Sequence, residues 1–158
     1  MSKIKAIEIL KELHKDVPLE TMENFDHHNK VTTYQHSLYV VSYSVKLSKY
    51  FNNIDIDSLV KGAMLHDFFG YDWKEFKKKK LGNHAKIHPL VSVERASKYI
   101  KLDNKTKNII EAHMWPKNIL VYPKSKEAWI VCLADKVCAI REFTSILKHL
   151  NDIVLDVK

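Results

Sequence analysis

The segment AMLHDFFGYDW, residues 63–73, joins an apolar run to two residues that can carry out chemistry. His66 and Asp67 stand side by side, and an imidazole or a carboxylate can bind a metal ion or transfer a proton. At helical spacing, His66 shares a face with Leu59 and Ala63, so this face is expected to point inward. The pair is therefore either the centre of a site or, in the simpler alternative, a helix end whose side chains contact backbone groups.

Three other segments place a titratable side chain on an apolar helical face, at His36, His113 and Asp135. A lone buried histidine is usually a hydrogen-bonded core residue, and Asp135 has the adjacent Lys136 as a possible ion-pair partner. An unpaired buried carboxylate is costly, however, so Asp135 must be paired, protonated or bound to a metal. Because four helices each supply such a group, the set favours a divalent metal site of the kind that helical bundles build from facing helices.

The elements that must position these residues are all predicted to be helices. Apolar residues recur at helical spacing, and no segment alternates as a strand over any length. Thr32 or Thr33 is expected to cap the second helix. Gly70 is expected to stop the third helix and Pro89 to open the fourth, with an irregular charged segment between them. The sequence thus predicts a single all-α helical bundle domain over residues 1–158. The helices are expected at about 2–14, 34–51, 57–69, 89–100, 103–115 and 125–143. A weaker helical tail is expected after the last of them.

Composition and charge restrict the class of function. The 158 residues are 46% hydrophobic and 28% charged, and no apolar run approaches the roughly 20 residues that cross a bilayer. The N-terminal stretch is too rich in lysine and glutamate for a signal peptide, and Cys132 and Cys138 form no CxxC motif, which indicates a soluble protein of the reducing cytoplasm. The net charge of +7 is most concentrated at Lys77–Lys80, as either a solvated run or a basic approach for an anionic substrate. The absence of zinc-finger and RNP-type motifs argues against dedicated nucleic-acid binding.

The order of these candidate residues along the chain resembles the HD superfamily of metal-dependent phosphohydrolases. The resemblance is carried by TYQHSLYV, GAMLHD and LADKV, and it spans about residues 33–141 of an all-α bundle. It implies a first divalent transition metal (Mn, Fe, Zn, Co or Ni) held by His36, His66, Asp67 and Asp135. It also implies that His88 and His113 would hold a second ion, with Asp67 bridging the two; His84 is a further candidate.

The sequence departs from many members of that family at two points. A glycine-lysine pair that often follows the doublet is missing, so Asp72 or Lys74 would have to replace its lysine. Binuclear members often have two adjacent histidines where this chain has Ala112-His113. On the resemblance we assign catalytic roles to Asp67, Asp72 and Lys136, and substrate contacts to Lys74 and His84.

The resulting expectation is a cytoplasmic, metal-dependent phosphohydrolase acting on a nucleotide or another small phosphorylated metabolite. The segment from Gly70 to His88 is expected to form the approach to the site, because binding residues concentrate in loops held by a rigid scaffold. Two alternatives are a metal- or nucleotide-binding module without turnover and an oxygenase with a di-iron site. The sequence leaves the number of ions and the oligomeric state open.

Overall fold

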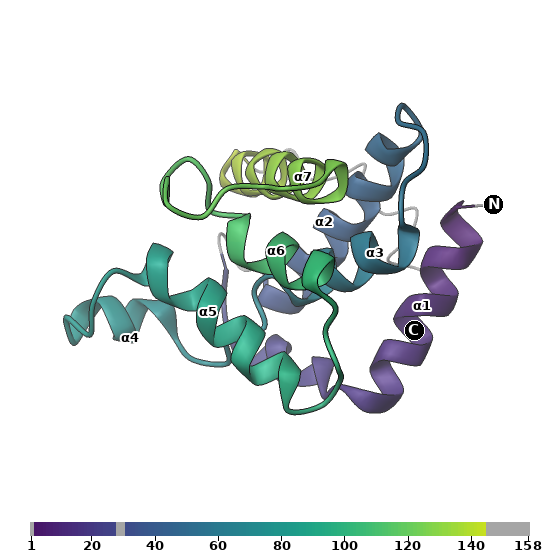
Figure 1. Ribbon diagram of the computed structural model, residues 1–158. Helices are drawn as coiled ribbons and strands as arrows, with labels where there is room; N and C mark the ends of the chain where they lie inside the picture. The colour runs from purple at the N-terminus through teal and green to yellow at the C-terminus, as the bar shows by residue number, and fades with distance from the viewer. Residues whose placement is uncertain (1, 28–30, 145–158) are drawn as a thin grey trace.

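Helices make up most of the part of the chain that the computed structural model describes, residues 2–27 and 31–144 (Figure 1). The only β-type pairing in this part is an isolated bridge between Asp26 and Thr32, so the all-α prediction is confirmed. The helices are α1 Ser2–Asp16, the 3-10 helix η1 Leu19–Asn24, α2 Thr33–Ser48, α3 Ile56–Leu65, α4 Trp73–Lys78, α5 His84–Ser97, α6 Asn104–Ala112 and α7 Lys126–Phe143.

Side-chain caps fix where the helices that carry the candidate residues begin. Thr32 caps α2 in a capping box with Gln35, as the sequence predicts. Asp103 accepts hydrogen bonds from the first backbone N–H groups of α6, and Ser125 accepts one from Ala128 at the start of α7. These starts agree with the predicted ones, so the helical register of the candidate residues is set locally.

Several boundaries differ from the predicted ones, including the ends of α5 at Ser97 and of α6 at Ala112, each three residues early. Helix α2 ends at Ser48, three residues early, and α3 ends at Leu65, just before the doublet. The charged segment after Gly70 is not wholly irregular, because Asp72 caps the short helix α4. Helix α5 begins at His84 and includes Pro89, since a proline this close to the start removes one backbone hydrogen bond but does not prevent the first turn. The predicted helical tail after α7 lies outside the described residues.

Helix α3 lies at the centre of the bundle and packs against α1, α2, α6 and α7. Leu59, Val60 and Met64 on this helix are completely buried. A side chain at Gly62 would collide with Ile109, so a side chain of α6 fills the space that this glycine leaves. The last turn of α3 is therefore held on all sides, which gives His66 and Asp67 a rigid base.

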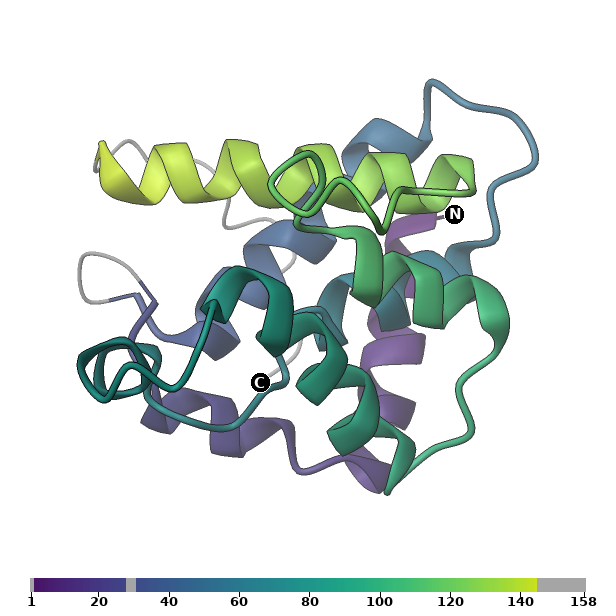
Figure 2. The same cartoon turned by 60° about the vertical axis from the view of Figure 1, so that its left-hand side comes forward.

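The remaining helices surround this centre. Helix α7 runs across α2 and α6 along one side of the bundle, whereas α4 lies at the periphery beside α5 (Figure 2). Among the helices of the described residues, none is both long and apolar enough to cross a membrane.

Candidate metal centre

His66 and Asp67 lie where α3 ends, and both are buried. His66 is the C-cap of α3, and its Nδ1 donates a hydrogen bond to the carbonyl oxygen of Ala63 at 2.7 Å. This bond points Nε2 of the ring away from the helix and toward α2 and α7. The simpler reading of the doublet, a contact with backbone, accounts for one nitrogen of His66 and leaves the other nitrogen and the carboxylate to be explained.

The first cluster joins the doublet to one residue of α2 and one of α7. Nε2 of His36 lies 3.3 Å from Nε2 of His66 and 3.1 Å from Oδ1 of Asp135. Nε2 of His66 lies 3.6 Å from that oxygen of Asp135 and 3.6 Å from Oδ2 of Asp67. The four residues that the family resemblance assigns to a first metal therefore converge from three helices.

The second cluster lies on the other oxygen of the same carboxylate. Oδ1 of Asp67 is 3.2 Å from Nε2 of His88 and 3.6 Å from Nε2 of His113, and these two nitrogens are 2.8 Å apart. The Nδ1 atom of His88 donates to the carbonyl of His84 and that of His113 to the carbonyl of Ile110. Asp67 is thus shared between two groups of possible ligands.

The donor atoms of both clusters suit a cation. Nδ1 of His66, His88 and His113 each donates to a carbonyl, so Nε2 is the nitrogen of each ring that is placed to bind an ion. Oδ1 of Asp67 is buried and has no hydrogen-bond donor among the described residues. The separations of 2.8 to 3.6 Å are those of neighbouring ligand atoms. Atoms about 2.1 Å from one ion lie about 3.0 Å apart at a right angle and about 3.4 Å apart in a tetrahedron.

Electrostatics keep the two carboxylates and His113 in the protonation states that a metal requires, whereas the pKa values of His36 and His66 are raised. Burial raises the pKa of Asp67 and Asp135, but the neighbouring imidazoles outweigh it and hold both pKa values well below their usual range. Burial, with His88 and His66 nearby, lowers the pKa of His113 to about 3. Burial also lowers the pKa of His36, but Asp135 and Glu142 outweigh it and raise this pKa to about 10. Two ionised carboxylates and a neutral His113 therefore face each other, and His36 exchanges a proton for an ion when it acts as a ligand.

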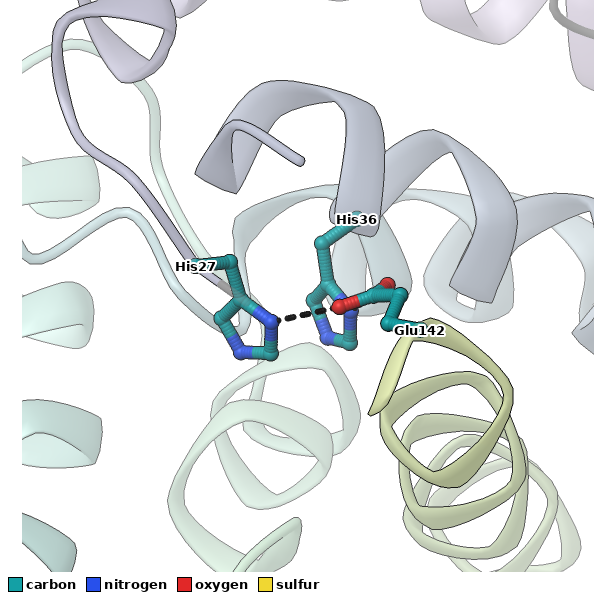
Figure 3. A group of neighbouring side chains, drawn as sticks. All are labelled: His27, His36 and Glu142. Carbon is teal, nitrogen blue, oxygen red and sulfur yellow. Dashed lines mark hydrogen bonds and ion pairs between the residues drawn. The ribbon is translucent and has the colours of Figure 1, made fainter. Parts of the chain in front are cut away.

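Two residues of this centre were not predicted, Glu142 on α7 and His27 in the segment before α2. Figure 3 shows the Glu142 carboxylate between the two imidazoles: it accepts from Nδ1 of His36 at 2.6 Å and from Nδ1 of His27 at 2.7 Å. The His27 ring stacks on the His36 ring, with centroids 3.7 Å apart, and its Nε2 lies 3.5 Å from Oδ2 of Asp67. The distances of 2.6 and 2.7 Å from Glu142 to the two Nδ1 atoms are hydrogen-bond lengths, so Glu142 orients both rings.

A cavity of about 600 Å³ opens beside the two clusters. The ligands Asp67, His88, His113 and Asp135 face it, and so does His27. Its remaining lining combines apolar side chains with two lysines and His84: Phe69, Trp73, His84, Met114, Pro116, Lys117, Lys136 and Ala139.

Three of the residues with predicted contacts to substrate or reacting groups occupy different positions relative to this cavity. His84 lines it, with its ring stacked on that of His88 at 4.4 Å between centroids. Lys136 also lines it, but its Nζ donates to the carbonyl of His113 at 2.8 Å, so the ammonium supports the second cluster from behind. Lys74 is not among the lining residues, and its Nζ lies 3.6 Å from Asp26.

The predicted role of Asp72 is not supported by its position. Its carboxylate accepts hydrogen bonds from the backbone N–H groups of Lys74 and Glu75, and it is not among the residues that line the cavity. The exposed run Lys77–Lys80 is not among them either. Of the segment expected to form the approach to the site, Trp73, His84 and His88 reach the cavity.

Comparison with known proteins agrees with this arrangement. The HD domain family matches residues 33–140, more than half of the chain, and this range contains all six predicted ligands. His27 and Glu142 lie just outside the matched range. Comparisons with curated proteins and with solved structures gave no match. The chain belongs to the HD domain family.

Proposed function

We propose that the protein is a metal-dependent phosphohydrolase acting on a nucleotide or another small phosphorylated metabolite. The observation that carries this proposal is the single carboxylate of Asp67, whose two oxygens face two different groups of imidazoles beside an open cavity. Phosphoryl transfer benefits from such a shared carboxylate because two neighbouring ions can act on one phosphate group. Membership of the HD domain family supports the same reaction class.

Different residues of the chain would hold the metal ions and orient the ligands. His36, His66, Asp67 and Asp135 would hold one divalent ion, and His88 and His113 with Asp67 would hold a second. Such ions lower the pKa of bound water and polarise a phosphoryl oxygen. Glu142 fixes the ring of His36 from behind, and the Lys136 ammonium fixes the backbone of His113. These supports keep the ligands in place before substrate arrives, which reduces the reorganisation needed during reaction.

The cavity suits a small phosphorylated molecule with an apolar or aromatic part. A volume of about 600 Å³ lies in the range of small-molecule sites. Lys117 is an exposed cation in its lining, and it offers attraction for a phosphate. Phe69, Trp73 and Met114 provide apolar surface on which a base could pack.

The test is phosphate release by the purified, metal-loaded protein from a panel of nucleotides and small phosphate esters. We expect release that requires added metal and is lost in Asp67→Asn but retained in Asp57→Asn. Asp57 is a matched control because its carboxylate pairs with Lys61 on the outside of α3. Metal-loaded protein that binds nucleotide without releasing phosphate would instead indicate a binding module.

The shared carboxylate also suits a di-iron centre, which gives the alternative oxygenase reading its own observation. Anaerobic loading with iron followed by exposure to oxygen separates the two. A phosphohydrolase should release phosphate without consuming oxygen. Oxygen uptake coupled to loss of an organic substrate, with no phosphate released, would favour the oxygenase.

A further inference from the structure

His27 belongs to no helix, but its backbone is held beside the first cluster from two sides. Its N–H donates to the carbonyl of Val31 at 2.7 Å, and the neighbouring Asp26 forms a bridge with Thr32 at the start of α2. The carbonyl of Asp26 also accepts from Nε1 of Trp73 at 3.1 Å, which ties the same segment to α4. The imidazole of His27 is therefore carried by a backbone segment that is fixed in place.

The imidazoles of His27 and His36 are held in the same way by one carboxylate. The two oxygens of Glu142 accept from Nδ1 of His27 at 2.7 Å and from Nδ1 of His36 at 2.6 Å. The two rings are nearly parallel, with an angle of 18° between their planes, and Nε2 of both lies on the side away from Glu142 (Figure 3). A carboxylate behind Nδ1 is a common support for an imidazole that binds a metal through Nε2. What Glu142 does for the expected ligand His36 it therefore also does for His27.

Nε2 of His27 points toward the oxygen of Asp67 that belongs to the first cluster. It lies 3.5 Å from Oδ2 of Asp67, and Nε2 of His66 lies 3.6 Å from the same oxygen. Both separations are longer than a usual hydrogen bond and close to those of neighbouring ligands of one ion. The side chain of His27 is 14% exposed and faces the metal cavity. Burial, with His36 nearby, lowers the pKa of His27 although two carboxylates act the other way, which favours the neutral ring that a metal requires.

We propose that His27 is a fifth protein ligand of the first metal ion, through Nε2, beside the four residues of the first cluster. The inference rests on the metal centre of the proposed function, but it requires no hydrolysis. The family match does not imply it, because the matched residues begin at position 33. Five protein ligands exceed the four of a usual zinc site, so His27 would favour a metal that accepts six ligands, such as Mn, Fe, Co or Ni.

His84 provides an internal comparison at the second cluster. Its ring stacks on that of His88 with centroids 4.4 Å apart and an angle of 20° between the planes, much as His27 stacks on His36. Nδ1 of His84, however, contacts the hydroxyl of Tyr71 at 3.1 Å rather than a carboxylate. Both imidazoles thus stack on an expected ligand and line the cavity, but only His27 shares the carboxylate that supports that ligand.

The experiment is titration of the metal-free full chain with Co²⁺, followed by its visible absorption, which depends on the number and type of ligands. The variants are His27→Phe and His27→Ala, with His84→Phe as the matched control. Phenylalanine keeps a ring that can stack but has no nitrogen to bind a metal. We expect both His27 variants to bind one Co²⁺ ion more weakly by more than about 100-fold, beyond the range typical of residues behind a ligand, and to change its absorption.

The control and a rescue separate binding from stacking. His84→Phe should bind Co²⁺ with the affinity and absorption of the wild type. Free imidazole should restore the absorption of His27→Ala, where it can occupy the vacated space, but not that of His27→Phe. Circular dichroism shows whether each variant is folded, and the rescue of His27→Ala decides the matter if His27→Phe does not fold.

The proposal is overturned by any of three results. Wild-type affinity and absorption in His27→Phe would mean that the ring acts by stacking alone. An equal loss in His84→Phe would mean that either ring only supports a ligand. A wild-type protein that binds no Co²⁺ would remove the metal centre and the fifth ligand with it. Phosphate release enters none of these measurements, so a protein that shows the expected Co²⁺ changes without hydrolysis would contradict the proposed reaction and leave the role of His27 supported.

Discussion

The two faces of α7 differ in which groups they present and in what lies against them. The inward face presents carboxylates, Asp135 and Glu142, and each contacts imidazoles from other parts of the same chain. The outward face presents large apolar residues such as Leu133 and Ile140, which are more than half exposed. The polar groups of the inner face therefore contact other parts of the chain, whereas the apolar groups of the outer face are exposed to solvent.

The largest effect on the inward side is expected from Asp67→Ala. Asp67 is the only residue whose oxygens face both clusters of the described chain, so its removal should abolish binding of metal and release of phosphate. The loss should exceed the about 10–100-fold change in affinity that is typical of residues behind a ligand. Metal content after dialysis measures it, with Asp57→Ala as the control. Retention of full metal content by Asp67→Ala would exclude Asp67 as a shared ligand.

A smaller effect is expected from His113→Ala, because it removes a ligand of the second cluster only. His36, His66 and Asp135 remain around the first position, so the variant should keep one ion and lose the other. Titration with a metal chelator, followed by elemental analysis, measures the ratio. If both ions are lost together, the two clusters are one site.

Glu142→Gln tests the inward face of α7 without touching a ligand. The amide cannot accept from both His36 and His27 as the carboxylate does, so metal affinity should fall by about 10–100-fold while binding persists. Glu127→Gln is the matched control, because Glu127 is also buried on α7 but accepts from the backbone N–H of Asp55, away from the metal centre. Equal affinities for the two variants would show that Glu142 has no role in orienting the ligands.

The smallest effects are expected at Asp72, which lies away from both faces of α7. Asp72→Ala should cost about 1 kcal/mol of local stability in α4 through loss of the cap, whereas Asp72→Asn keeps a capping side chain. Neither variant should change the rate of phosphate release at saturating substrate. A rate lowered in both would return Asp72 to the catalytic role that the sequence suggested.

Periodicity was the part of the sequence that predicted the structure well. The inward faces of α2, α3 and α7 follow from apolar residues at helical spacing, and His36, His66 and Asp135 lie buried on those faces. The same spacing also contained Glu142, seven residues after Asp135, so this residue could have been found by extending the stripe by one step. Periodicity places residues correctly wherever a regular helix carries them.

The two residues about which the sequence was least informative, His27 and Asp72, lie outside the long periodic helices. His27 belongs to the irregular segment before α2, and only the folded chain brings it to Glu142, 115 positions away. A catalytic role is predicted for Asp72 because it lies soon after the doublet His66-Asp67. It is followed three residues later by Glu75, a pattern typical of a helix start, and the structure has Asp72 as the cap of α4.

The central claim is that Asp67 and the imidazoles around it hold divalent metal ions, and elemental analysis of the purified chain after metal loading and dialysis tests it most directly. We expect two transition-metal ions per chain, one for each cluster that shares Asp67, and none in Asp67→Ala. Wild-type protein that retains no stoichiometric metal, or that retains the same amount as Asp67→Ala, would contradict the account.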